Sequence, residues 1–161
     1  MHTPSLSHYR TPRALALLAV FLLVVIAVGG LIGVANVPGA WYLALHKPAF
    51  NPPNWIFAPV WLVLYVLIAI AGWRTFLADR TGQSMWLWLG QLALNWAWSP
   101  VWFGLHALWP AFVIILALLV LILAFIATSW RRNRVSAWLF VPYALWVAFA
   151  GSLNLSIALL N

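Results

Sequence analysis

Five long apolar stretches alternate with short polar segments along the 161 residues of the chain. Each is close to the roughly 20 residues that a helix needs to cross the hydrocarbon core of a bilayer. Ten-residue segments of alternating hydrophobicity, which mark membrane β-strands, do not occur in the sequence. The pattern predicts an all-α integral membrane protein, a bundle of five transmembrane helices at residues 14–36, 55–73, 85–104, 110–130 and 135–160. Residues 1–13 would form an N-terminal tail, and 14–161 a single membrane domain.

Charged residues make up 6% of the chain, and the formal net charge is +7. The basic residues are divided unequally between the two ends of the predicted bundle. The first connection, residues 37–54, holds only Lys47, whereas the tail and the second and fourth connections hold Arg10, Arg13, Arg74, Arg80, Arg131, Arg132 and Arg134. This bias places the N-terminus in the cytoplasm and the first connection on the opposite side. No basic cluster is extensive enough to indicate nucleic acid, and a retained first helix favours a bacterial inner membrane.

Acid–base and metal chemistry have little support in the composition. Asp79 is the one acidic residue and cysteine is absent, so paired-carboxylate catalysis, thiolate metal sites and hard-cation sites are excluded. The four histidines lie in the tail or in connections. His46 could approach a haem iron, although a histidine in a loop is more often solvated. We therefore expect no metal site and no required cofactor.

Polar and small residues inside the spans are candidates for packing or binding. Gln91, Asn95 and Ser99 follow at intervals of four, which places them on one helix face. They could hydrogen bond between helices or orient a ligand in an apolar cavity. Gly29 with Gly33, and Ala93 with Ala97, have the small-x-x-x-small spacing that permits close helix packing or dimerisation. Pro100 and Pro142 should kink or open their helices.

The first loop, residues 37–54, is long for a connection in a compact bundle. Pro48, Pro52 and Pro53 fix several of its φ angles, and Trp41, Tyr42 and Phe50 are costly to leave in water. We expect the loop to fold back as a stiff lid over the bundle. The alternative is a loop that lies in the lipid headgroups with interfacial aromatic residues.

Three segments resemble one family of membrane proteins. The stretches "WYLALHKPAFNPPNWIFAPVWLVLY" (41–65), "GQLALNWAWSPVWFG" (90–104) and "PYALWVAFAGSLN" (142–154) are similar to motifs of the TspO/translocator proteins, also called tryptophan-rich sensory proteins or peripheral benzodiazepine receptors. The resemblance implies a five-helix bundle, commonly a homodimer, with a cavity closed by the first loop. It implies porphyrins such as protoporphyrin IX and haem as ligands, together with sterols such as cholesterol and synthetic benzodiazepine-type compounds. The residues that would contact a ligand are Trp41, Phe50, Asn95, Trp146, Ala150 and Leu153, with Gln91 one turn from Asn95.

Phe50 departs from the family pattern, which usually has tryptophan there. Some members are thought to degrade protoporphyrin with light, using that tryptophan and the one matching Trp146. Phenylalanine keeps the apolar contact but lacks the readily oxidised indole, so binding is favoured over an enzymatic role. Four readings remain open: a porphyrin-binding sensor, a passive transporter, a photochemical enzyme and a bundle without a ligand.

Overall fold

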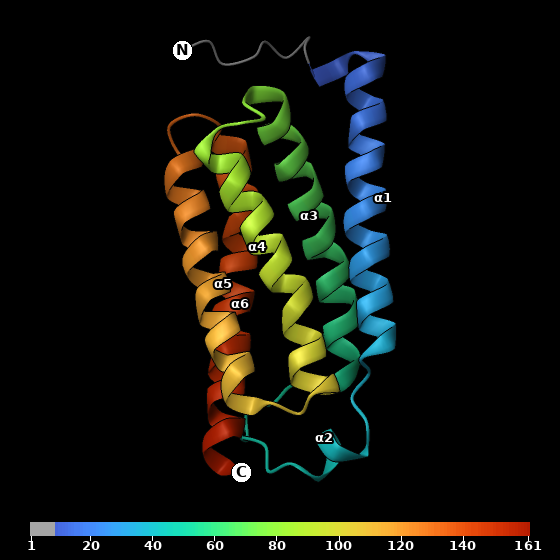
Figure 1. Ribbon diagram of the computed structural model, residues 1–161, viewed down its shortest axis with the longest axis vertical. Helices are drawn as coiled ribbons and strands as arrows, with labels where there is room; N and C mark the ends of the chain where they lie inside the picture. The colour runs from blue at the N-terminus through green and yellow to red at the C-terminus, as the bar shows by residue number, and fades with distance from the viewer. Residues whose placement is uncertain (1–8) are drawn as a thin grey trace.

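The computed structural model describes residues 9–161, and its long helices stand side by side as one bundle (Figure 1). The long helices are α1 (Pro12–Ala35), α3 (Phe57–Ala78), α4 (Gln83–Ser99), α5 (Leu108–Ser129) and α6 (Arg134–Leu160). Three short elements complete the order, namely α2 (Ala40–Ala44), the 3₁₀ turn η2 (Asn54–Ile56) and the π-helix η3 (Pro100–Gly104). The first loop therefore contains a short helix, α2.

Four helical segments are long and apolar enough to cross a membrane. They are Pro12–Ala35, Asn54–Ala78, Leu108–Ser129 and Arg134–Leu160. The chain is thus a helical membrane protein, as its pattern predicts. The span expected at 85–104 is divided between α4, which has 17 residues, and η3, so a fifth span is not among these four.

Proline determines how the expected span at 85–104 ends. Pro100 lacks the N–H that would continue the α-helical hydrogen bonds. The chain widens there into the π-helix, in which the N–H of Leu105 donates to the carbonyl of Pro100 at 2.9 Å. The expected local opening at Pro100 is confirmed, whereas α6 continues as a helix through Pro142.

Helix ends differ from the expected limits for local reasons. Thr11 caps α1, accepting a hydrogen bond from the Ala14 N–H at 3.2 Å, so α1 begins two residues early. The expected second span ends at Trp73, but α3 continues to Ala78, because its last turn packs at the end of the bundle. Pro110 lies within the first turn of α5, where its missing N–H would have no intrahelical partner.

Large aromatic residues pack into notches left by small ones. The Trp88 ring lies where a side chain on Gly72 would be, and its indole N–H donates to the Ile68 carbonyl at 2.9 Å. The Tyr65 ring occupies the corresponding place against Gly29 of α1. Of the expected glycine pair, Gly33 faces open space, so close packing involves Gly29 alone.

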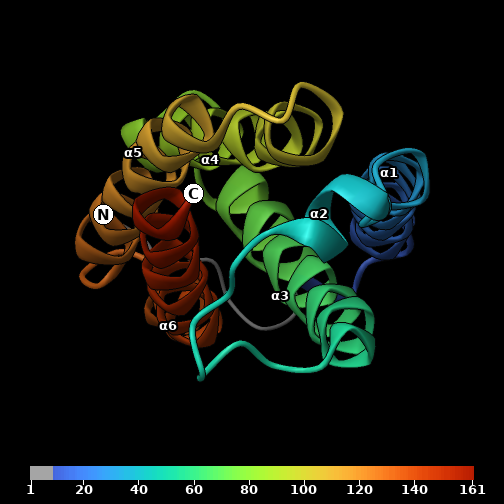
Figure 2. The same cartoon turned by 90° about the horizontal axis from the view of Figure 1, so that it is seen from below.

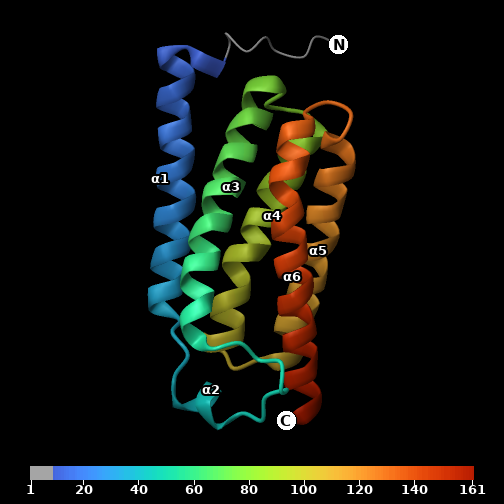
Figure 3. The same cartoon turned by 180° about the vertical axis from the view of Figure 1, so that it is seen from behind.

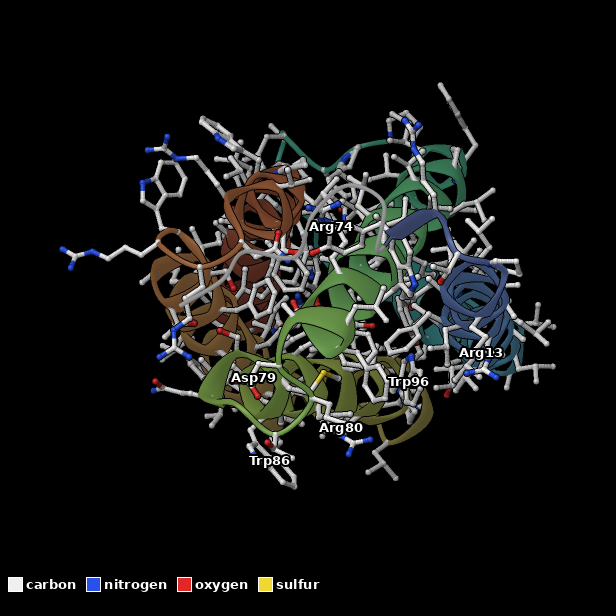
Figure 4. All side chains as sticks on the ribbon, turned by 90° about the horizontal axis from the view of Figure 1, so that it is seen from above. Arg13, Arg74, Asp79, Arg80, Trp86 and Trp96 are labelled. Carbon is white, nitrogen blue, oxygen red and sulfur yellow. The ribbon has the colours of Figure 1, made fainter. Side chains whose placement is uncertain are left out.

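One end of the bundle carries most of the charge, and we call it the arginine end. Arg13 lies in the first turn of α1 and Arg74 near the end of α3. Asp79 and Arg80 lie in the connection from α3 to α4, at the end of the bundle that Figure 4 views from above. Asp79 pairs with Arg132 at 3.8 Å, and both side chains are about half exposed, so the pair adds little stability. The opposite end is the loop end, where the first loop runs beneath the helices from α1 towards α6 and back to α3 (Figure 2).

Candidate functional site

Two aromatic residues of α2 fasten the first loop to the loop end of the bundle. The Trp41 ring stacks on His106 at 4.2 Å between centroids and meets Trp102 edge-on at 6.2 Å. His106 adopts a positive φ of 56°, which turns the chain after η3 towards the loop. Tyr42 is buried, and its hydroxyl donates to Asn51 Oδ1 at 3.4 Å. Burial raises the pKa of Tyr42 above its ordinary value of 10.0, and the hydrogen bond with Asn51 partly offsets this.

A second attachment joins the loop to the end of α6. The backbone N–H of His46 donates to Asn161 Oδ1 at 3.0 Å, and Asn161 Nδ2 donates back to the His46 carbonyl at 3.0 Å. Lys47 donates to the Leu43 and Leu45 carbonyls and lies over the Tyr42 ring. The ammonium group of Lys47 therefore makes its contacts within the first loop itself.

A groove of about 740 Å³ runs between α3 and α6 on the side of the bundle. Its lining is almost entirely apolar and comes from these two helices: Pro59, Val60, Val63, Leu64, Leu67, Pro142, Leu145, Trp146 and Phe149. The two helices meet near the arginine end, where the Ser136 hydroxyl donates to the Ala71 carbonyl at 3.3 Å. They diverge towards the loop end (Figure 3), which leaves the groove in that half of the bundle.

Aromatic rings gather along this groove. Trp146 lies 5.6 Å from Phe149 and 5.8 Å from Phe57 between ring centroids. Phe50 of the first loop reaches Phe149 at 6.4 Å and remains 52% exposed. The indole N–H of Trp146 is buried without a hydrogen-bond partner among the described residues. The groove therefore offers flat apolar surfaces, while the unpaired indole N–H is buried behind them.

A second void, at the arginine end, is much smaller. It has a volume of about 30 Å³ and lies between the ends of α3 and α5 near Thr75, Ser129 and Asn133. Such a volume holds one or two water molecules. The groove between α3 and α6 is accordingly the candidate ligand site.

Gln91 and Asn95 lie in the interior of the bundle, in a hydrogen-bonded chain. Tyr65 donates to Asn95 Oδ1 at 3.3 Å, and Asn95 Nδ2 donates to the Tyr143 hydroxyl at 2.8 Å. Tyr143 in turn donates to Gln91 Oε1 at 3.0 Å. Gln91 Nε2 has no partner among residues 9–161. Hydrogen bonding between α3, α4 and α6 is therefore what these polar side chains do in this structure.

The structure brings some of the expected site residues together and separates others. Trp146 lines the groove, and Phe50 lies at the end nearest the loop. Trp41 instead stacks on the ring of His106. Ala150 and Leu153 are buried along α6 and do not line the groove. Whether these residues, Gln91 and Asn95 contact a ligand stays a prediction.

Sequence reasoning missed most of the groove walls. The α6 wall follows the helical spacing 142, 145, 146 and 149, and the α3 wall follows 59, 60, 63, 64 and 67. Both are stripes at intervals of three and four, which mark one helix face. In a membrane helix such a stripe is indistinguishable from ordinary lipid-facing surface, because every side of the helix is apolar.

Comparison with known proteins gives a consistent result over nearly the whole chain. A model of the TspO/MBR family matches residues 17–160, from α1 to the end of α6. Protein CrtK of Rhodobacter capsulatus is 36% identical over 152 residues, covering 92% of this chain and 94% of that protein. The tryptophan-rich sensory protein of Cereibacter sphaeroides is 35% identical over 127 residues, covering 77% and 78%. The translocator protein of Ovis aries is 38% identical over 135 residues, covering 78% and 79%.

Proposed function

The chain belongs to the TspO/MBR family, and from this premise we propose that it binds porphyrins, such as protoporphyrin IX or haem, in the groove between α3 and α6. Family membership supports a membrane role in sensing or transport related to tetrapyrroles or sterols in general. The finer proposal is that porphyrin occupancy of the groove serves tetrapyrrole sensing, regulation or transport.

The size and walls of the groove carry this proposal. Its volume of about 740 Å³ lies within the range of small-molecule sites, about 300–1,000 Å³. The rings of Trp146 and Phe149 suit a planar macrocycle, because offset or edge-on contacts stabilise aromatic pairs beyond the area they bury. The Trp146 N–H is buried and unpaired among the described residues, so it could serve an acceptor on the ligand only if the indole ring reorients on binding. A sterol could use the same apolar walls.

The remaining architecture is proposed on the same family premise. We expect α4 and η3 to form the fifth span, since Gln83–Ser99 and Pro100–Gly104 are continuous along the chain. The arginine end would face the cytoplasm of a bacterial inner membrane, and the first loop would act as a lid on the other side. A homodimer is expected. The outward face of α4 is one candidate surface, because Ala93 and Ala97 are exposed and Trp86 points away from the bundle (Figure 4).

A photochemical activity has less support than binding. At the end of the groove nearest the loop the chain presents Phe50, whose ring is harder to oxidise than an indole. Passive transport remains compatible with the groove, because its lining contains no ionisable side chain to couple transport to protons.

Porphyrin titration of purified protein in detergent tests the proposal. We expect a saturable shift of the porphyrin absorption band, and Trp146→Ala should weaken apparent affinity by about tenfold because it removes a principal ring contact. Trp55→Ala is the matched control, since Trp55 is 74% exposed and does not line the groove. An unsaturable shift, or equal effects of the two substitutions, would contradict groove binding.

A further inference from the structure

We propose that ligands enter and leave the groove sideways, directly from the hydrocarbon of the bilayer, while the first loop stays closed. This inference rests on the proposed function, because it concerns the route to the same groove. It limits the ligands to compounds that dissolve in the membrane before they bind.

The origin of the groove walls is the first argument. All nine lining residues belong to α3 or α6, and none comes from residues 37–54. Val63 and Leu145 are 58% and 69% exposed, whereas Leu64 behind them is 3% exposed. The first two therefore form an outward-facing rim and Leu64 part of the floor. A ligand can pass between the rim residues without displacing the loop.

The depth of the groove is the second argument. On α3 its lining begins three residues into the helix and extends over residues 59–67, about 12 Å along the axis. A bilayer core is about 30 Å thick, so the rim opens onto acyl chains in the loop half of the membrane. Because no charged side chain lines the groove, it offers no hydrated path from the aqueous phase.

The attachments of the first loop are the third argument. Trp41 is stacked on His106 at one side of the bundle, and His46 exchanges two hydrogen bonds with Asn161 at another. Entry past the loop would break at least one of these attachments. Lateral entry breaks neither, since it needs only the displacement of lipid from the rim.

A disulfide that locks the loop separates the two routes. The chain has no native cysteine, so His46→Cys combined with Asn161→Cys places a single pair at the attachment to α6. The protein is reconstituted in vesicles that contain protoporphyrin IX, and association is followed by tryptophan quenching. We expect the oxidised and reduced forms to bind at rates within about twofold of each other. Association at least tenfold slower in the oxidised form, with unchanged final occupancy, would overturn lateral entry.

A label on the groove rim tests the same route without the disulfide. Leu145→Cys is loaded with protoporphyrin IX, then reacted with a bulky maleimide, and release into protein-free vesicles is measured. We expect release to slow by at least tenfold. Val113→Cys is the control, since Val113 is 65% exposed on α5 and does not line the groove. Release from labelled Leu145→Cys at the unlabelled rate would refute the route. Failure of the unmodified protein to bind porphyrin saturably would instead refute the proposed function.

Discussion

Replacing Tyr143 with phenylalanine removes a single oxygen from the centre of the polar chain inside the bundle. That oxygen accepts a hydrogen bond from Asn95 at 2.8 Å and donates one to Gln91 at 3.0 Å. The phenylalanine ring retains the edge-on contacts that Tyr143 makes with Phe140 and Trp61. The substitution therefore isolates the hydrogen bonds from the packing.

The expected loss follows from the number of bonds. Hydrogen bonds between membrane helices contribute about 0.6 kcal/mol on average and up to about 1.7 kcal/mol. Because Tyr143 is fully buried, no water replaces either bond. Two bonds together predict a loss of about 1–3 kcal/mol in the free energy of unfolding. Tyr65→Phe removes one bond, to Asn95, and should cost about half as much.

Equilibrium unfolding in mixed micelles measures both values. Tryptophan fluorescence reports the transition as the denaturing detergent is raised, and secondary structure in the native micelle checks that each variant folds. The reasoning requires Tyr143→Phe to be less stable than Tyr65→Phe. Equal losses, or a Tyr143→Phe variant as stable as the parent, would refute the view that this chain of side chains joins α3, α4 and α6.

Four further outcomes are expected. Gly29→Ala should lower the melting temperature because a methyl group would clash with the Tyr65 ring. Gly33 faces open space, so Gly33→Ala should leave the melting temperature unchanged or raise it. Equal effects of the two substitutions would contradict the close packing of Tyr65 against Gly29. Phe50→Trp should increase light-dependent loss of the porphyrin absorption band over the parent protein, measured against free porphyrin. Trp41→Ala should accelerate proteolysis within the first loop, because it removes the stack on His106; cleavage at the parental rate would contradict that attachment. The raised pKa of Tyr42 means that docking of the first loop favours the neutral phenol. Docking is therefore fully stabilised below pH 10 and weakens as the pH rises through the higher folded-state pKa. Unchanged protease sensitivity of the loop across that pH range would contradict this role of Tyr42.

The hydrophobic pattern predicts most of the architecture because length and apolarity are what the bilayer selects. Four of the five predicted stretches correspond to α1, α3, α5 and α6, with ends shifted by caps such as Thr11. The division of the third stretch at Pro100 follows from its missing N–H, although the sequence does not specify that a π-helix results.

The site could be predicted only in part. The family motif singles out Trp146, which lines the groove. Phe50 is singled out because it departs from that motif, and it lies beside Phe149 of the lining. The spacing of Gln91 and Asn95 predicts their shared polar face. Their partners Tyr65 and Tyr143 come from helices whose relative rotation the pattern does not fix. For the same reason the outward face of α3 could not be identified as one wall of a groove.

The divergence of α3 and α6 from their contact at Ala71 and Ser136 makes the opening a wedge. The opening ends where the two helices meet, so the thickness of a molecule would decide how far it can advance towards that contact. A ring system one atom thick would come to rest deeper than a puckered steroid. Molecules of different shape would thus be held at different levels of the membrane by one pair of helices.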